Sequence, residues 1–142
     1  MFIVLILTAT IVHGYINLGL KEATHRRNQI KVNHLRETFG KAYVGSHSIS
    51  GLDAAARRLI IEDPVVENDR LHSWFDRLSG DYSPSGFGVE VVLRNEDERW
   101  VHISSNKDAV QRYVSRGTLS VSKVGGEIST VDVEVALFEI AD

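Results

Sequence analysis

The first twenty residues of the chain, MFIVLILTATIVHGYINLGL, contain no Asp, Glu, Lys or Arg, and charged residues begin abruptly at Lys21. A helix that crosses a bilayer needs about 20 mostly apolar residues, because each residue adds about 1.5 Å of rise and the hydrocarbon core is about 30 Å thick. Residues 1–20 meet that length. They therefore predict a single-pass transmembrane helix, with the lipid bilayer as one partner of the chain.

Basic residues gather directly behind this run. Residues 21–44 carry six Lys or Arg and two Glu, whereas the rest of the chain carries ten basic and seventeen acidic residues. Positive charge beside an apolar span is typical of its cytoplasmic end, so we expect the C-terminal domain in the cytoplasm. The residues expected at this membrane flank, where basic side chains bind anionic lipid, are Lys21, Arg26, Arg27, Lys31 and Arg36.

Two other interpretations of residues 1–20 stay open. A signal peptide cleaved after Gly14, with Val12 and Gly14 as the small residues of the cleavage site, would export the rest of the chain. The absence of a basic residue before the run counts against it. A helix buried in a protein core would also be apolar on all sides. The basic flank favours the anchor among the three.

Composition narrows the chemistry. The 142 residues include no cysteine, which excludes disulfides, cysteine-based metal sites and a cysteine nucleophile. The acidic body would repel phosphate, so nucleic acid is not expected as a partner. No P-loop, no dinucleotide-binding glycine motif and no HExxH sequence occurs, so we expect neither a cofactor nor a metal.

Beyond residue 20 the sequence divides into three stretches. Residues 21–41 predict a basic juxtamembrane helix that ends at Gly40, and residues 42–50 predict a linker containing Gly and Ser. Residues 51–142 predict a folded domain. Ser50 with Asp53 three residues on indicates an N-cap and a helix from residue 51, which Pro64 ends. The apolar positions expected to face the core from two helices are Leu52, Ala55, Ala56, Leu59 and Ile60, then Leu71, Trp74, Phe75 and Leu78 before Gly80.

From Phe87 the apolar period changes from helical spacing to strict alternation. Residues 87–94 and 100–104 predict a hairpin, residues 107–116 a short helix capped by Ser105 or Asn106, and residues 118–124 and 128–140 a second hairpin around Gly125–Gly126. The predicted order of elements is α-α-β-β-α-β-β after the transmembrane helix. This is an α+β fold class with a four-stranded antiparallel sheet that helices cover on one face.

One group of titratable side chains has helical spacing. Asp69, His72 and Asp76 are three and four residues apart on the second helix, a spacing that can hold a metal or orient a general base. At 100° per residue the three side chains point away from the apolar stripe, and Arg70 and Arg77 lie alongside. We therefore interpret the trio first as a solvent-exposed, salt-bridged face, and second as a candidate catalytic group.

No catalytic motif is present, so the sequence favours a protein-interaction or regulatory module over an enzyme. On this hypothesis another protein is the partner, and the acidic body and any exposed sheet edge form the contact surface. The alternative is a small-ligand-binding domain or hydrolase with a pocket between the helices of residues 51–79 and the sheet. That alternative predicts that His72, His102 or Asp81 converge on one concave site.

Overall fold

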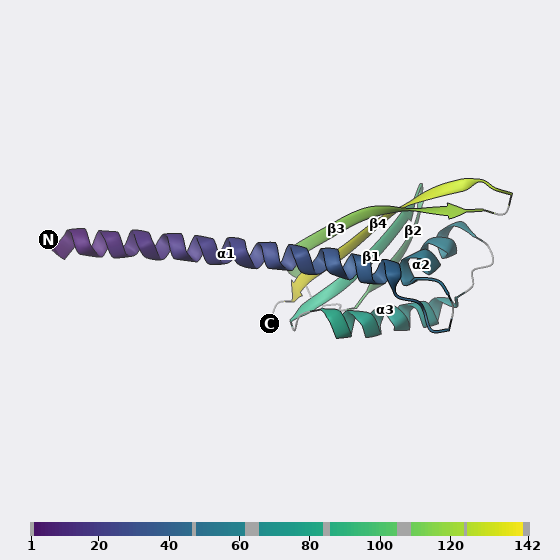
Figure 1. Cartoon of the computed structure of the whole chain (residues 1–142), viewed down its shortest axis with the longest axis horizontal. Helices are drawn as coiled ribbons and strands as arrows, with labels where there is room; N and C mark the ends of the chain where they lie inside the picture. The colour runs from purple at the N-terminus through teal and green to yellow at the C-terminus, as the bar shows by residue number, and fades with distance from the viewer. Residues whose placement is uncertain are drawn as a thin grey trace.

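The computed structural model describes residues 2–46, 48–61, 66–83, 86–104, 109–123 and 125–140, with the backbone alone for residues 2–18 and 109–111. In this part of the chain three helices precede four strands (Figure 1). The helices are α1 (Phe2–Lys41), α2 (Gly51–Ile60) and α3 (Asn68–Tyr82), and the strands are β1 (Phe87–Asn95), β2 (Glu98–Ile103), β3 (Ala109–Ser122) and β4 (Ile128–Ile140).

The strands pair into an antiparallel sheet in the order β2-β1-β4-β3, so β2 and β3 form its two edges. The predicted α+β class with a four-stranded antiparallel sheet is confirmed. Strict alternation divides each strand into two sets of side chains. Val91 of β1, for example, lies opposite His102 of β2 and Val135 of β4, and all three point to the face that the helices cover.

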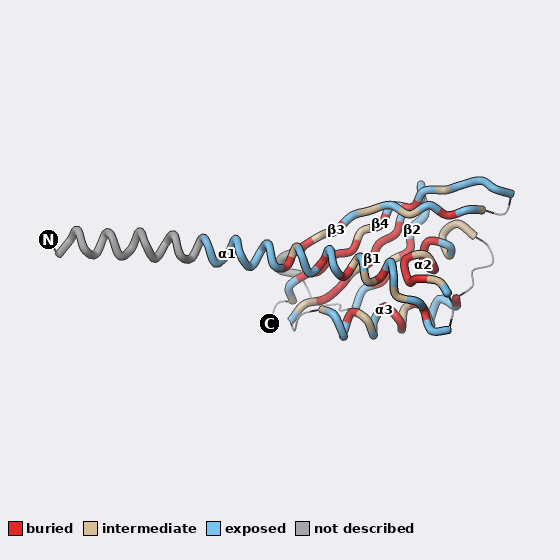
Figure 2. The backbone as a smooth tube through the Cα atoms, viewed as in Figure 1, coloured by how far each residue is buried: buried red, intermediate tan, exposed pale blue. Residues whose placement is uncertain are grey.

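The core lies between this inner face of the sheet and the three helices (Figure 2). Burying aliphatic and aromatic side chains on both layers is what stabilises such a two-layer arrangement. The largest fully buried side chains come from every layer of the fold: Phe39, Phe75, Leu35, Leu71, Leu93 and Leu137. All the positions predicted to face the core from the first two helices of the domain are buried or half-buried, and Leu59, Ile60 and Leu78 are in the half-buried group.

Helix α1 joins the body through its second half. Val32, Leu35 and Phe39, three and four residues apart, are all buried, and the Phe39 ring packs edge-on against Phe75 with centroids 4.9 Å apart. Residues 19–27 are exposed, and the helix projects from the body toward its N-terminus (Figures 1 and 2). This apolar stripe of α1 is thus part of the core of the domain.

The predicted transmembrane helix is wrong as a part of the fold class. Among the described residues, no helix has both the length and the apolarity that crossing a membrane requires. The physical reason lies in residues 19–41 of α1, where charged side chains recur from Lys21 onward and the apolar stripe is used to pack against the protein. The compartment of the chain stays a prediction that the structure does not test.

The predicted element order α-α-β-β-α-β-β is also wrong, because residues 109–116 are strand and not helix. Together with residues 117–122 they form the 14-residue strand β3, which pairs with β4 along its whole length. Tyr113 and Ser115 are buried and alternate with exposed Arg112 and Arg116, which is strand periodicity. Residues 105–108, which include the predicted helix cap, lie outside the described part of the chain.

The start of α2 follows the sequence signal closely. The Ser50 hydroxyl accepts a hydrogen bond from the backbone N–H of Asp53 at 3.2 Å, as an N-cap should. Beside it, the Trp74 ring lies against Gly51, and the Trp74 Nε1–H donates to the Tyr43 carbonyl at 3.1 Å. The loop between α1 and α2 is thereby fixed to α3.

The outer face of the sheet carries no helix among the described residues (Figure 1). Arg112 of β3 bridges Glu134 of β4 at 2.8 Å and Glu90 of β1 at 2.6 Å, so one guanidinium connects three neighbouring strands. Arg116 adds a longer contact of 3.4 Å to Glu134. The ion pairs lie over Val92, Ala136 and Phe138, which are buried although they point to the outer face.

Candidate functional site

One row of side chains on α3 faces strand β2 at the edge of the sheet. Asn68, His72 and Asp76 are four residues apart, so they lie one above the other along the helix. All three contact β2. Asn68 Oδ1 accepts a hydrogen bond from the Trp100 indole N–H at 3.0 Å, and His72 and Asp76 both bind the ring of His102.

Strand β2 positions Trp100 and His102 on the inner face because they are two residues apart. The His72 ring stacks on the Trp100 indole with centroids 4.7 Å apart and an angle of 17° between the planes. His102 is only 4% exposed, and its ring also stacks on Phe75. The aromatic packing fixes both imidazoles, so their nitrogens have defined partners.

The two imidazoles and one carboxylate form a linear hydrogen-bonded chain. His72 Nδ1 lies 2.7 Å from His102 Nδ1, and His102 Nε2 lies 2.9 Å from Asp76 Oδ1. Asp76 is at the exposed end of this chain, with 60% of its side chain accessible. We refer to His72, His102 and Asp76 as the histidine relay.

The hydrogen-bond partners of the three side chains indicate which imidazole nitrogens of the histidine relay carry a proton. An ionised carboxylate only accepts hydrogen bonds, so His102 must donate to Asp76 from Nε2. A neutral His102 then accepts at Nδ1, and His72 donates to it from its own Nδ1. This leaves the Nε2 lone pair of His72 as the free basic position, since the described residues provide no hydrogen-bond partner for that atom.

Burial keeps His102 neutral. Loss of water around the ring lowers the pKa of His102 below its ordinary value of 6.5, and the neighbouring His72 lowers it further. The Asp76 carboxylate acts in the opposite direction by charge and by its hydrogen bond, but the burial effect is larger.

The relay has the connectivity of an acid–base group, with a carboxylate orienting one imidazole, which orients the next. It does not have the arrangement of a metal site. Among the described residues no cluster of three or more His, Asp or Glu side chains is suited to hold a metal ion. The predicted absence of a metal remains a prediction, because residues outside the described ranges are not tested.

The structure separates the predicted trio. His72 and Asp76 belong to the histidine relay. Asp69 is exposed on α3 and is not one of its members. The expectation that all three point to solvent was wrong for His72, which is half-buried against Trp100. Their catalytic role is still a prediction, because geometry alone tests no activity. Asp81, the other acid named with the histidines, is exposed near the end of α3.

Sequence reasoning undervalued His102. The sequence linked His102 only to the pocket of the ligand-binding alternative, although it stands two residues after Trp100 and therefore on the same inner face. An imidazole at an inward position needs hydrogen-bond partners, because burying an unpaired polar group is costly. That requirement was the signal that could have linked His102 to the polar row of the preceding helix.

The basic residues expected at a membrane flank have two different environments. Lys21, Arg26, Arg27 and Lys31 are exposed on α1. Arg36 instead lies against β3, where its Nε–H donates to the Ser115 hydroxyl at 2.7 Å and its guanidinium approaches Gly117. Lipid binding by this group stays a prediction, whereas Arg36 also has a packing role.

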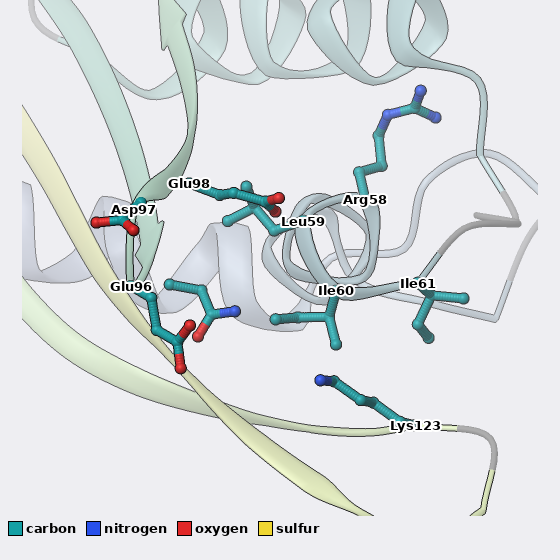
Figure 3. Close-up of a pocket in the computed structure, with 9 residues that line it drawn as sticks. Arg58, Leu59, Ile60, Ile61, Glu96, Asp97, Glu98 and Lys123 are labelled. Atoms are coloured by element: carbon teal, nitrogen blue, oxygen red, sulfur yellow. The ribbon is translucent and has the colours of Figure 1, made fainter.

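A cavity of about 690 Å³ opens between the end of α2 and the β1–β2 turn (Figure 3). Three acids of the turn, Glu96, Asp97 and Glu98, lie on one side, and Ile60 and Lys123 lie on the other. The cavity is thus between a helix of the 51–79 stretch and the sheet, as the ligand-binding alternative expected. However, the members of the histidine relay do not line it, so the acid–base group and the cavity are separate places.

Comparison with protein family models, with curated proteins and with solved structures finds no match to this chain. The function must therefore be argued from the geometry of the described residues alone.

Proposed function

We propose that the chain is a protein-interaction module that binds an extended polypeptide segment along the free edge of β3. The observation that carries the proposal is the uncovered half of this strand. β3 is 14 residues long, and in the described part of the chain it has a strand neighbour, β4, on one side only. The unpaired backbone groups of an edge strand are a template for another strand, and β-strand addition is a common mode of peptide recognition.

The backbone direction along β3 is fixed by two hydrogen bonds. The Val114 carbonyl accepts from the Gln29 side chain of α1 at 2.9 Å, so the backbone of Val114 points outward. The Lys123 N–H donates to the backbone carbonyl of Glu127 at 2.7 Å, on the β4 side. Because the direction alternates along a strand, Thr118, Ser120 and Ser122 direct their N–H and C=O groups to the free edge.

Helix α1 protects only the first part of this edge. Gln29 satisfies Val114, and Arg36 covers Ser115 and Gly117, but Thr118, Ser120 and Ser122 are exposed. Edge strands are usually protected by charge, proline or a covering element. Residues 117–122 have no charge and no proline, which supports a segment kept available for a partner.

A test is selection of displayed ten-residue peptides on the full chain. We expect selected peptides to have strand-forming sequences, and their binding to fall at least ten-fold in Ser120→Pro. Proline removes an outward N–H there and no hydrogen bond to β4. Thr130→Ala, opposite Ser120 on β4 and away from the free edge of β3, is the control and should bind normally. Selection of no peptide, or binding that ignores Ser120→Pro, would refute the module.

A second candidate function is acid–base catalysis by the histidine relay, with His72 Nε2 as the base that takes a proton from water in a hydrolysis. The hydrogen-bonded chain of His72, His102 and Asp76 favours it, because each member orients the next. Broad screens with chromogenic esters and phosphate esters test it. Turnover that His72→Gln abolishes and Asp69→Asn retains would favour this function over the interaction module, and the absence of such turnover would exclude it.

A further inference from the structure

Resting on the proposed interaction module, we infer that the strand that pairs with β3 is β3 of a second copy of this chain, antiparallel and centred on Ser120. The two copies would be related by a two-fold axis through the Ser120 pair. Such pairing would join two four-stranded sheets into one continuous sheet of both copies.

The register follows from backbone direction. In an antiparallel pair, residues opposite one another exchange both hydrogen bonds only if both point toward the partner. The outward residues of β3 are the even-numbered ones, so an even-numbered residue must lie opposite an even-numbered residue of the second copy. The two-fold axis then passes either through a hydrogen-bonded pair of one even-numbered residue or through a non-hydrogen-bonded pair of one odd-numbered residue. Centring on Ser120 places Thr118 opposite Ser122 of the second copy, and all three outward residues are exposed. Each then exchanges two backbone hydrogen bonds.

The side chains are self-complementary in this register. On the inner face, Leu119 lies opposite Val121 of the second copy, and cross-strand apolar pairs stabilise a sheet. On the outer face, Thr118, Ser120 and Ser122 meet one another, and hydroxyl pairs of this kind are favourable. The sequence of residues 118–122, Thr-Leu-Ser-Val-Ser, is in effect symmetric about its centre.

Side-chain matching and the covering helix favour the Ser120 register over its neighbours. Centring on Leu119 would place Gly117, which Arg36 lies against, opposite Val121 of the second copy. Centring on Val121 would place Leu119 opposite the charged Lys123. Centring on Thr118 would bring Arg116 opposite Ser120 and would require Val114 to leave its Gln29 partner. Centring on Ser122 would extend the pairing past the end of β3. The Ser120 register keeps the Gln29 contact, and it ends at Gly117, where Arg36 lies against the strand.

Because the natural chain has no cysteine, single cysteines give a direct test on the full chain. Opposite residues in a hydrogen-bonded pair have Cα atoms about 5.5 Å apart, within the range that a disulfide spans. Ser120→Cys should therefore form a covalent dimer under mild oxidation. Thr130→Cys is the matched control, because Thr130 is exposed opposite Ser120 but lies on β4 and not on the β3 edge that would meet the second copy. We expect its oxidation to be at least ten-fold slower.

Cysteines at Thr118 and Ser122 test the predicted register of the two β3 strands. Thr118→Cys alone should not cross-link, because the two thiols would be separated by four residues along the strands, about 13 Å. A mixture of Thr118→Cys and Ser122→Cys chains should give the mixed disulfide. Equal cross-linking of all variants, or faster cross-linking of Thr130→Cys, would overturn the inference.

Sedimentation of the full chain separates this inference from the proposed function. We expect a concentration-dependent species of twice the 15.8 kDa mass, lost in Ser120→Lys, which puts like charges on the axis, and retained in Thr130→Lys. A monomer at all concentrations, or a dimer indifferent to Ser120→Lys, overturns the second-copy inference. If such a monomer still binds displayed strands in a Ser120-dependent way, the interaction module stands, and if that binding is also absent, both fall.

Discussion

The Trp74 indole lies directly against the α-carbon of Gly51: a Cβ built on this glycine would be 1.9 Å from the ring. The contact joins the first residue of α2 to the middle of α3. The ring cannot move aside easily, because Trp74 is buried, its N–H is bonded to Tyr43 and its face packs near Phe39 and Phe75.

Gly51→Ala is therefore expected to lower the free energy of unfolding by about 3 kcal/mol, because overpacking forces rigid aromatic groups apart. Gly80→Ala is the matched control. Gly80 lies exposed in α3 with nothing near its Cβ position, so alanine should stabilise the helix by about 0.5–1 kcal/mol. Urea unfolding followed by circular dichroism measures both changes. A neutral Gly51→Ala would show that the Trp74 contact is not tight.

Phe39→Ala is expected to lower the free energy of unfolding by about 3–5 kcal/mol, because the Phe39 side chain is fully buried where α1 packs against α3. Ile30→Ala on the same helix should change it by less than about 0.5 kcal/mol, since Ile30 is exposed. The same denaturant titration compares the two variants. Equal effects would mean that the packing of α1 does not depend on its apolar stripe.

The stability of the protein should depend on pH through His102. Because the pKa of His102 is lowered in the folded state, the unfolded chain binds the proton more readily. The stabilisation is complete above the ordinary value of 6.5 and declines as the pH falls from there through the folded pKa. A single proton gives a slope of at most about 1.4 kcal/mol per pH unit.

His102→Gln should remove this part of the pH dependence, so the difference between natural chain and variant isolates His102. Thermal unfolding between pH 7.5 and pH 5 measures it. A difference that stays constant over this range would contradict a neutral, buried His102.

Arg112→Gln should reduce the free energy of unfolding by about 0.5–1 kcal/mol at low salt, because it breaks the connection of Arg112 to Glu90 and Glu134. The loss should shrink as salt is added, since exposed charges are screened. Arg99→Gln, at an exposed arginine on β2 at the opposite edge of the sheet, is the control and should have a smaller effect. A salt-independent loss would indicate packing rather than charge.

The sequence correctly predicted the helices and strands in which the apolar residues follow a single period. The stripe of Leu71, Trp74 and Phe75 predicted a helix, and the alternation around Val89 and Val91 predicted a strand, because each segment has one buried face. The predicted N-cap at Ser50 was also correct, because a cap depends only on residues that are close in sequence.

The helix prediction was wrong for residues 109–116, because both a helical and a strand period fit this part of the sequence. Tyr113 and Val114 are adjacent, and both are removed from solvent, one on the inner face and one half-buried on the outer face. A strand with apolar side chains on both faces loses its clean alternation, and a helix of the same composition is then equally consistent. Pairing with β4 decides between them, and that partner is more than ten residues away.

The candidate site was half predictable. The spacing of His72 and Asp76 located one side of the relay, but its centre, His102, comes from a strand 26 and 30 residues later. The spacing of residues along one helix gives their relative direction, whereas the contact between helix and strand depends on how the two layers pack. The transmembrane helix in the predicted fold class rested on the apolarity of residues 1–20 alone, and among the described residues no helix is long and apolar enough to span a membrane.

The contacts between α1 and β3 also constrain the synthesis of the protein. Gln29 and Arg36 meet partners 85 and 79 residues further along the chain. A ribosome adds about 5–20 residues per second, so the apolar stripe of α1 waits roughly 4–16 s for the strand that helps to cover it. During that interval a nascent helix presents Val32, Leu35 and Phe39 to solvent or to a chaperone. The last-made hairpin, rather than the first-made helix, thus completes the fold.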